Sequence, residues 1–172
     1  MLRQATDDDV DTIRALRNQR ANREVSLTAH EISAGEHAGW WARTSVDPGR
    51  RVLIYERDGR TAGVVNFFDL DSSLRTGAWG FFLDAEGLAD TGQTLPAWIE
   101  VMKEATGYAF DTLGLDELTG EVLEHNTAVR QLNRRFRFTE GEPELRYADG
   151  RELTVLPIKL TKDNRRKPKE NR

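Results

Sequence analysis

The feature that most restricts the fold is a long amphipathic segment placed between two short apolar ones. Residues 95–113 carry apolar side chains at intervals of three and four, and Gly114 follows them, which is typical of a helix and its C-terminal end. The flanking segments 77–83 and 118–123 have the length and composition of strands. Two strands joined through a helix lie parallel in one sheet. Where such a pair diverges at its C-terminal ends, a ligand crevice opens.

The other apolar segments predict antiparallel pairing around this parallel pair. Two Asp-Gly pairs, at 58–59 and 149–150, each separate two apolar runs, and such pairs favour two-residue hairpin turns. The predicted strands are residues 2–5, 52–55, 62–68, 77–83, 118–123, 138–147 and 153–160. We therefore expect an α+β fold with a mixed, mostly antiparallel sheet of six to seven strands, helices on both faces and a splayed parallel strand pair.

Capping signals predict three further helices. Thr6-x-x-Asp9 and Ser33-x-x-Glu36 each precede apolar residues at helical spacing, and Asn126 or Thr127 precedes a third such run. In the second helix His37 is expected to pack beside Trp40 and Trp41. The segments 18–28 and 69–73, and the segment around Gly87 and Gly92, are expected to be loops.

Composition restricts the partners of the chain. The 172 residues suit one domain, expected at residues 1–160, followed by a basic disordered tail at 161–172. The absence of cysteine excludes disulfides and thiolate metal sites, and no other metal-binding pattern is present. The formal net charge of -4 argues against nucleic-acid binding. Without a signal peptide or a run of about 18 apolar residues, we expect a cytoplasmic protein with no membrane partner. A homodimer is left open.

Two segments resemble a known family. Residues 121–138, EVLEHNTAVRQLNRRFRF, are similar to the strand–Asn–helix–Gly-Phe signature of the GCN5-related N-acetyltransferase (GNAT) superfamily. Residues 108–118, YAFDTLGLDEL, resemble the end of its long helix and the entry to its next strand. The order of predicted elements over residues 2–160 also resembles the GNAT fold. The run His30-Glu31-Ile32-Ser33, followed by Glu36-His37 and Trp40, is similar to amino-sugar N-acetyltransferases of the pseudaminic acid pathway type, which act on a nucleotide-linked amino sugar.

The resemblance implies an enzyme that moves an acetyl group from acetyl-coenzyme A to a primary amine of a small molecule, with no metal. The coenzyme would lie between the strands 77–83 and 118–123, with its pyrophosphate at the start of helix 95–113. The residues that would contact it are Phe82, Leu83, Gly92, Gln93, Thr94, Asn126 and Asn133.

Three departures from the family pattern concern coenzyme binding and the acid step. Ala89 and Thr94 stand where the family's pyrophosphate loop has Gln or Arg and Gly or Ala, and Asn133 stands where many members carry a Tyr that protonates the leaving thiolate. An amide donates a hydrogen bond but is a poor proton donor. These departures put both standard coenzyme binding and the acid step in question.

Direct attack by an amine requires a base that removes its proton. The resemblance places His30 and Glu31 on the segment that lines the acceptor pocket, and Glu121 on the strand that borders the cleft. We therefore predict His30, Glu31 and Glu121 as catalytic residues. Asn18, Trp40 and Trp79 are predicted to bind the acceptor, with a helix-packing or core role as the alternative for the two tryptophans.

Two other functions remain open from the sequence. A protein N-terminus is an alternative acceptor, as in ribosomal-protein acetyltransferases, which share this layout. The altered Ala89 and Thr94 positions also allow a GNAT-fold protein that has lost catalysis and serves as a binding module.

Overall fold

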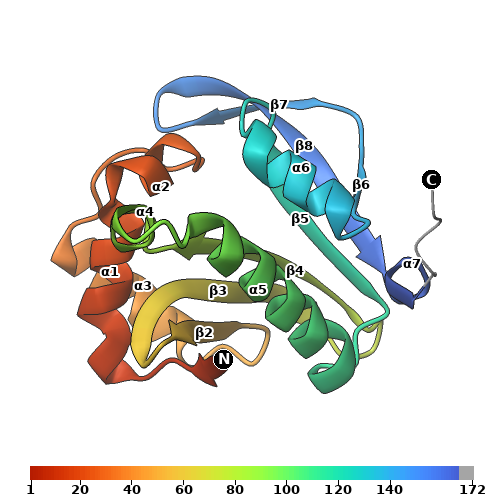
Figure 1. Cartoon of the computed structure of the whole chain (residues 1–172), viewed down its shortest axis with the longest axis horizontal. Helices are drawn as coiled ribbons and strands as arrows, with labels where there is room; N and C mark the ends of the chain where they lie inside the picture. Colours follow the sequence, from red (N-terminus) through yellow and green to blue (C-terminus); the bar gives the residue numbers. More distant parts are fainter. Residues whose placement is uncertain (167–172) are drawn as a thin grey trace.

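Eight strands form one mixed sheet in the computed structural model, which describes residues 1–166 (Figure 1). The strands follow the order β1-β2-β3-β4-β5-β8-β6, and β7 also pairs with β8. Every pair is antiparallel except β4 with β5. Their bounds are β1 Leu2–Gln4, β2 Arg51–Arg57, β3 Arg60–Asp71, β4 Thr76–Leu83, β5 Glu117–Leu123, β6 Thr139–Glu140, β7 Glu144–Ala148 and β8 Arg151–Thr161.

Both predicted Asp-Gly turns are present. Asp58 and Gly59 join β2 to β3 with φ angles of 51° and 73°, and Asp149 and Gly150 join β7 to β8 with φ angles of 54° and 70°. Two consecutive residues with positive φ form the tight turn whose twist matches that of paired strands. The two hairpins lie at opposite parts of the sheet, on either side of the parallel pair.

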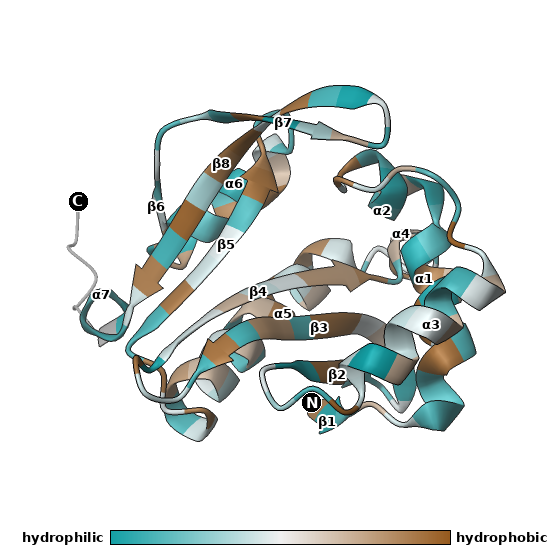
Figure 2. Cartoon of the chain, turned by 180° about the vertical axis from the view of Figure 1, so that it is seen from behind, coloured by the Kyte–Doolittle hydropathy of each residue, from teal (hydrophilic) through white to brown (hydrophobic). Residues whose placement is uncertain are grey.

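The parallel strands β4 and β5 are paired over a short stretch and then separate. Their register runs from Thr76 opposite Glu117 to Ala78 opposite Thr119. Beyond this point β4 stays paired with β3 and β5 stays paired with β8. The facing edges of β4 and β5 are therefore left unpaired towards their C-terminal ends, and Figure 2 shows the two strands diverging. This confirms the predicted splayed pair.

Helices cover both faces of the sheet (Figures 1 and 2). α5 (Thr94–Gly107), extended by a π-helical turn at Tyr108–Thr112, lies with α6 (Thr127–Arg135) on one face. α1 (Val10–Asn18) and α3 (Ala34–Thr44) cover the other. The remaining helices are short: η1 Asp7–Asp9, α2 Arg20–Glu24, α4 Ala85–Asp90 and α7 Lys162–Arg166. No helix within residues 1–166 combines the length and apolar character needed to cross a membrane.

Side chains of β4 alternate between the two faces. Trp79, Phe81 and Leu83 belong to or pack on the larger core cluster, under α5 and α6. Phe82 packs on a smaller cluster with side chains of α1. This alternation, which the strand geometry imposes, decides which side chains can line each side of the gap between β4 and β5.

The predicted N-caps are observed. The backbone N–H of Thr6 donates to the Asp9 carboxylate at 2.8 Å, and the Ser33 hydroxyl accepts from the N–H of Glu36 at 3.2 Å. The Glu36 carboxylate contacts the His30 ring.

Two of the predicted loops contain helices. α2 lies within the segment 18–28, and α4 includes Gly87. Both helices are too short for a periodic apolar face, and each depends on side-chain hydrogen bonds. The Asp84 carboxylate accepts from the N–H of Gly87 at 3.1 Å and so caps α4. Neither helix carries a sequence pattern that distinguishes it from a polar loop.

The C-terminal part of the chain also differs from the prediction. The predicted strand 138–147 is divided into β6 and β7 around Pro143, which has no N–H for a sheet, and this division raises the strand count to eight. The tail predicted to be disordered from residue 161 contains the last residue of β8 and the helix α7. Residues 167–172 of that tail lie outside the described residues.

Candidate active site

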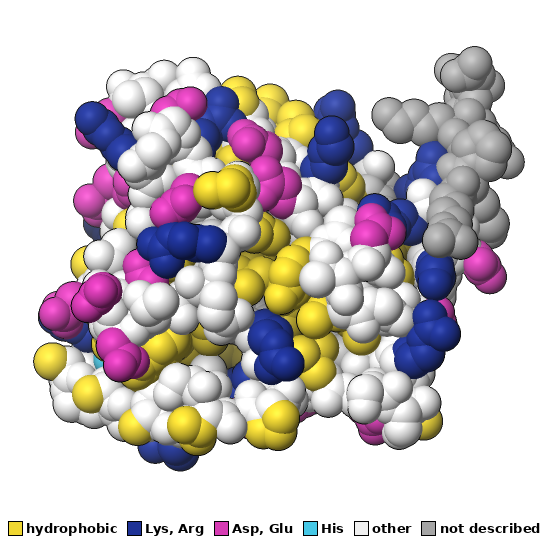
Figure 3. Space-filling view, turned by 90° about the horizontal axis from the view of Figure 1, so that it is seen from below, with side chains coloured by type: hydrophobic (Ala, Val, Ile, Leu, Met, Phe, Trp, Pro, Cys, Tyr) yellow, Lys and Arg dark blue, Asp and Glu magenta, His cyan; other side chains and the backbone are white. Residues whose placement is uncertain are grey.

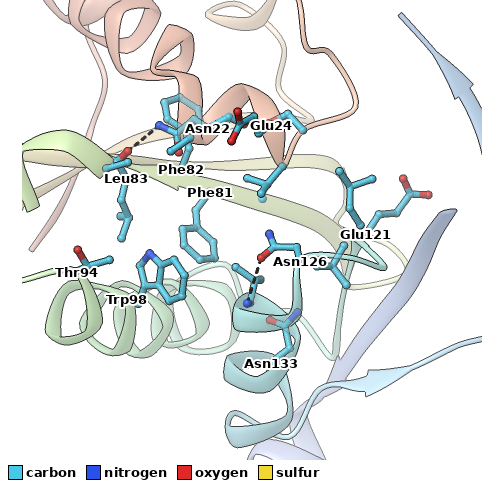
Figure 4. A pocket seen from close by; sticks show the side chains of 18 of the residues that line it. Asn22, Glu24, Phe81, Phe82, Leu83, Thr94, Trp98, Glu121, Asn126 and Asn133 are labelled. Carbon is cyan, nitrogen blue, oxygen red and sulfur yellow. Dashed lines mark hydrogen bonds between the residues drawn. The ribbon is translucent and has the colours of Figure 1, made fainter. Parts of the chain in front are cut away.

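The diverging strands border a cavity of about 410 Å³ on the α5 and α6 side of the sheet (Figure 4). We call it the first cavity. Its walls come from elements that are far apart in the sequence: α2, β4, α4, the N-terminal part of α5, β5, α6 and β8. Lining residues labelled in Figure 4 are Asn22, Glu24, Phe81, Phe82, Leu83, Thr94, Trp98, Glu121, Asn126 and Asn133. The gap between the strands is therefore an accessible slot.

A second cavity, of about 700 Å³, meets the first at the point where β4 and β5 part. Trp79, Gly80, Glu121 and Ile158 line both cavities. Gly80 leaves room at this junction, because no atom lies within 4 Å of the position that a Cβ would take. Two molecules bound in the two cavities can therefore come into contact through the opening.

A third cavity, of about 340 Å³, continues from the second along the same face of the sheet. Asn66 and Phe82 line it, and each lies two residues along its strand from a residue of the second cavity, namely Phe68 and Gly80. Its remaining walls come from α1, α3 and the segment between α2 and α3: Ile13, Arg17, Thr28, Ile32, Glu36, His37, Trp40 and Arg43.

The third cavity contains a cation without a counterion. Arg17 donates Nη2 to the carbonyl oxygen of Thr28 at 3.0 Å, but its buried Nη1 has no acceptor among residues 1–166. Burial lowers the pKa of Arg17, and repulsion from Arg23 lowers it further. The Oδ1 of Asn66 is also buried without a donor in the described part of the chain. A desolvated, unpaired guanidinium favours an anionic ligand beside it.

Asn133 is the most buried polar side chain of the first cavity. It is 1% exposed, and neither its Oδ1 nor its Nδ2 has a partner within the described residues. A buried amide without partners costs about 1–3 kcal/mol, so a ligand that bonds it recovers that free energy. Asn126 lines the same cavity, and its Oδ1 accepts from the N–H of Val129 at 3.3 Å. Asn126 thus caps α6 and lies at the cavity in the same conformation.

Glu121 lies at the junction of the first two cavities, on the cleft border where the sequence predicts it. It is on β5, just beyond the last position that pairs with β4. Arg146 on β7 donates Nη2 to its Oε1 at 2.9 Å and also forms an ion pair with Glu144. These two carboxylates raise the pKa of Arg146. Arg146 therefore fixes one oxygen of Glu121, and a ligand or a water molecule can reach the other.

The carboxylates of the second cavity outnumber its cations. Asp69, Glu121, Glu140 and Glu144 line it, with Lys159 as the only lining cation among residues 1–166. Glu140 accepts from Arg130 at 3.0 Å and from Arg134 at 2.8 Å, outside the cavity wall. The lining charge suits an ammonium group.

The start of α5 offers few hydrogen-bond donors. Pro96 has no N–H, and the N–H of Ala97 already donates to Gln93. Thr94 lines the first cavity, while Gly92 and Gln93 do not. The side-chain carbonyl group of Gln93 accepts from Arg57 at 3.0 Å. The N–H groups of Thr94 and Leu95, at the first two helical positions, and the Thr94 hydroxyl are the donors left for an anion.

His30 and Glu31 lie outside all three cavities. The His30 ring lies on the surface between two carboxylates, with Nδ1 3.0 Å from Asp149 and Nε2 3.0 Å from Glu36. These neighbours raise the pKa of His30. A ring whose nitrogens both face carboxylates and whose pKa is raised is poorly placed to take a proton from an amine. Glu31 is exposed beside it.

The predicted acceptor-binding residues have three different positions. The side-chain amide of Asn18 donates Nδ2 to the carbonyl oxygen of Ile32 at 2.9 Å, and its Oδ1 accepts from the N–H of Ile32 at 2.8 Å. Both groups of the amide therefore hold the segment before α3. Trp40 lines the third cavity, and its ring centroid lies 4.8 Å from that of the buried His37, which packs beside it as expected. Trp79 lines the first and second cavities.

The sequence gives no direct signal for several lining residues. Asn22 donates to the carbonyl oxygens of Leu16 and Leu83, both at 2.8 Å, and brings α2 to the cavity. The helical periodicity assigns Trp98 only to a helix core, yet it lines the first cavity. A tryptophan in the first turns of a helix that follows a splayed strand is a signal that could have identified Trp98.

Basic side chains gather at the other end of the groove between α5 and α6. Lys103, Arg135, Arg137 and Arg165 line a cavity there, and Figure 3 shows Lys and Arg side chains gathered on the right of the molecule. Arg137 has a positive φ of 68°, and its Nη1 donates to carbonyl oxygens of α7 at 3.2 Å. This contact gives Arg137 a role in joining α6 to α7. The described residues contain no group of three or more side chains arranged to hold a metal ion.

Comparison with known families gives one match. The model of the acetyltransferase (GNAT) domain family matches residues 1–139. These residues include β4, α5, β5 and α6, which together form most of the first cavity. No curated protein matches the sequence significantly.

Several solved structures share the architecture. Spermidine N-acetyltransferase from Vibrio cholerae, in complex with CoA and spermine, has 17% sequence identity and a TM-score of 0.79, and the alignment covers 96% of each chain. A mutant form of the Vibrio cholerae enzyme has 20% identity and a TM-score of 0.79, over 96% of this chain and 97% of that one. A protein provisionally named a phosphinothricin N-acetyltransferase has 17% identity and a TM-score of 0.76, over 94% and 97%. At these levels of sequence identity, the similarity shows a shared fold and nothing more.

Proposed function

The chain belongs to the GNAT acetyltransferase family, and from that premise we propose that it acetylates the primary amine of a small molecule that also carries an anionic group, such as a nucleotide-linked amino sugar. The acetyl donor is acetyl-coenzyme A. The amine lies in the second cavity and the anionic group in the third. The observation that carries the proposal is the unpaired guanidinium of Arg17 in the third cavity.

The first cavity fits the pantetheine arm of the coenzyme. Its length follows the unpaired edge of β4, whose free N–H and C=O groups suit the two amides of pantetheine. Phe81, Trp98 and Val129 supply apolar contacts, and the buried amide of Asn133 supplies both a donor and an acceptor. Thr94 at the start of α5 is placed for the pyrophosphate. Coenzyme A supplies the thioester that the amine attacks.

The start of α5 suits the pyrophosphate less well than the slot suits pantetheine. Asp84, Glu86 and Asp90 lie on or beside α4, and negative charge there opposes a phosphate. The backbone N–H groups of Thr94 and Leu95 do not depend on side-chain identity, so they favour phosphate binding in spite of the repulsion from these carboxylates. We expect a coenzyme affinity that rises with salt, because salt screens the repulsion.

Glu121 is placed to remove the proton of the amine, directly or through one water molecule. The nitrogen lone pair then forms the new C–N bond with the thioester carbonyl, and N–H groups on the free edge of β4 stabilise the oxyanion. When the C–S bond breaks, the electron pair stays on sulfur as a thiolate. Asn133 donates a hydrogen bond to that thiolate, and solvent supplies its proton.

A cationic polyamine is the second candidate acceptor. The carboxylates of the second cavity favour it, and the Vibrio cholerae protein of similar fold was solved with spermine. The unpaired Arg17 opposes it, because a polyamine extending into the third cavity would meet a buried cation. We therefore place the anion-bearing amine first and the polyamine second.

Release of free thiol from acetyl-coenzyme A tests the proposal. The assay compares a uridine-diphosphate amino sugar, the same amino sugar without the nucleotide, spermidine and a peptide with a free N-terminus. We expect the nucleotide-linked sugar to give the highest kcat/KM. Preference for spermidine would support the second candidate, preference for the peptide would support protein N-terminal acetylation, and transfer to none would support a binding module.

A matched set of variants assigns the anion site. Arg17→Met should raise the KM for the nucleotide-linked sugar about 10- to 100-fold, the loss of one charge-assisted hydrogen bond, and leave kcat for the free amino sugar almost unchanged. Arg17→Lys keeps the charge and should recover part of the affinity. Arg20→Met, on the exposed face of α2, is the control. Equal effects of Arg17→Met on charged and uncharged acceptors would reject the anion site.

A further inference from the structure

One segment lines all three cavities. Ser26 lines the first cavity, Leu27 the second and Thr28 the third, and the segment continues to Ala29 and His30 on the surface. We call residues 26–30 the strap. It joins α2 to the residues before α3 and contains no helix or strand. Any movement of the strap changes the walls of the donor and acceptor cavities together.

Arginine side chains bind the carbonyl oxygens along the strap. Arg151 donates Nη2 to Ser26 and Leu27, both at 3.1 Å. Arg17 donates to Thr28 at 3.0 Å, and Arg23 donates to Ala29 at 3.4 Å. Arg17 and Arg23 come from the N-terminal helices, whereas Arg151 comes from β8. The strap is thus held from both sides of the cleft.

The turn between β7 and β8 binds the far end of the strap. The Asp149 carboxylate accepts from the N–H of Ala29 at 2.9 Å and from the N–H of His30 at 2.7 Å. About 120 residues separate the partners in sequence, so these bonds connect the two ends of the fold across the cleft. Figure 1 shows the β7–β8 hairpin reaching towards the segment that follows α2.

The His30 ring adds a titratable contact at this junction. Asp149 of the hairpin lies at Nδ1 and Glu36 of α3 lies at Nε2, both at 3.0 Å. The other charged groups of the surroundings are Glu31, next in the chain, and Arg23 and Arg151, which bond the strap backbone. A protonated ring donates to both carboxylates, but a neutral ring has one N–H and turns a lone pair towards the other carboxylate.

We propose that His30 is a pH-sensitive latch that holds the strap on the β7–β8 turn and closes the acceptor side of the cleft when its ring is protonated. The role in acceptor entry rests on the proposed function, which places the acceptor in the second and third cavities. The latch itself rests only on the contacts of residues 26–30, 36 and 149.

The direction of the pH effect follows from the shifted pKa. Hydrogen bonding to Asp149, and then to Glu36, raises the pKa of His30 from its ordinary value of 6.5. A raised pKa means that the contact stabilises the closed strap fully below about pH 6.5 and that this stabilisation is lost as the pH rises through the raised value. The backbone bonds from Ala29 and His30 to Asp149 remain, so the strap loosens without being released.

Hydrogen exchange of the strap amides tests the latch without any requirement for activity. Peptides that cover residues 26–32 are followed from pH 5.5 to 8.5 by mass spectrometry, with rates corrected for intrinsic exchange. In the wild-type protein we expect protection to fall about two- to fivefold over this range, the effect of an exposed ion pair. In His30→Gln the strap amides should show, at every pH, the low protection that the wild type reaches at pH 8.5. Identical profiles of the wild type and His30→Gln would overturn the latch.

Two further variants sharpen the result. His125→Gln removes the other exposed imidazole and should keep the wild-type pH dependence of strap exchange. Glu36→Gln leaves Asp149 in place and should reduce the dependence by about half. If His125→Gln lost the pH dependence of strap exchange to the same extent as His30→Gln, the assignment of this dependence to His30 would be wrong.

The pH dependence of KM tests acceptor gating. We expect the acceptor KM of the wild type to change with pH in parallel with strap exchange, with a flat profile in His30→Gln and little change in the KM for acetyl-coenzyme A. A pH-dependent strap with a pH-independent acceptor KM would overturn the gating role. Failure of every amine as acceptor would refute the proposed function and leave the exchange result intact.

Discussion

The side-chain amide of Asn22 donates to the carbonyl oxygen of Leu83 at 2.8 Å and so ties α2 to the last residue of β4. The same Nδ2 also donates to Leu16 near the end of α1. Asn22 is 8% exposed, and its helix carries no apolar face. One side chain therefore positions a whole wall of the first cavity, between the acceptor side and the donor side.

Replacement of Asn22 by Ala should destabilise the protein by about 1–3 kcal/mol, because two buried carbonyl groups lose their donor. Urea unfolding followed by circular dichroism measures this change. Arg20→Ala, on the exposed face of the same helix, should give no measurable change, since its ion pair with Glu24 is exposed to solvent. Equal midpoints for the wild type and Asn22→Ala would contradict the positioning role.

Replacement of Asn133 by Leu should lower activity without lowering stability. The leucine removes two unpaired buried polar atoms, so the free energy of unfolding of the ligand-free protein should stay the same or rise by about 1 kcal/mol. Activity should fall, with kcat/KM about 10- to 100-fold lower, because a bond to the donor substrate is lost. Gln131→Leu, on the exposed side of α6, is the control. A variant that is less stable and fully active would show that Asn133 is structural.

Replacement of Glu121 by Ala should lower kcat about 100-fold or more if this carboxylate removes the amine proton. A small carboxylate such as formate should restore part of the rate when added to the variant, because the vacated position lies at the junction of two cavities. Glu117→Ala, four residues earlier on β5 and paired with Lys159, should retain the wild-type rate. Absence of both the loss and the rescue would exclude Glu121 as the base.

Two glycines at the opening should respond differently to alanine. A Cβ at Gly120 would lie 2.9 Å from the carbonyl oxygen of Trp79, so Gly120→Ala should force β4 and β5 apart and destabilise the protein by about 1–3 kcal/mol. A Cβ at Gly80 meets nothing within 4 Å and enters the shared opening. Gly80→Ala should therefore leave stability almost unchanged and raise the KM values. Calorimetric melting and steady-state kinetics separate the two outcomes, and a reversed order would contradict the geometry.

Acid should weaken the contact between α6 and β6. Arg130, and then Arg134, lower the pKa of Glu140 from 4.5 to about 2. A lowered pKa means that the contact is fully present above about pH 4.5 and is lost as the pH falls towards 2. After allowance for screening by solvent, the free energy of unfolding should fall by about 1–2 kcal/mol when Glu140 is protonated. Unfolding midpoints at pH 7 and pH 3 should differ less in Glu140→Gln than in the wild type, whereas Glu142→Gln should behave as the wild type.

The main lines of the fold could be read from the sequence because they depend on local patterns. The helix 95–113 and its flanking strands follow from periodicity, and the hairpins follow from two Asp-Gly pairs whose backbone needs positive φ. The short helices α2 and α4 could not be predicted, because side-chain bonds from distant elements stabilise them. Gln19, for example, accepts from the N–H of Ala85 at 2.8 Å and donates to Asp84 at 2.7 Å.

The candidate site was predicted in part. Glu121 lies on the strand that borders the gap, and Asn126 and Asn133 belong to the helix that comes next in the chain. Their positions therefore depend on one local unit. The structure brings all three residues to the first cavity. His30 follows from resemblance alone. Its neighbours Asp149 and Glu36 place it at the surface, and Asp149 lies over a hundred residues away. The sequence assigns Arg17 no place in the site, and only its burial identifies it.

Spacing along the chain was enough to establish the order of the main strands and longer helices, the crossover that creates one parallel pair, and the residues on that crossover. Three properties of the site needed the folded protein: how far the parallel pair stays closed, which cations lack a counterion and which loops meet over the cleft. These properties depend on distances between residues far apart in sequence, and local propensity carries no information about such distances.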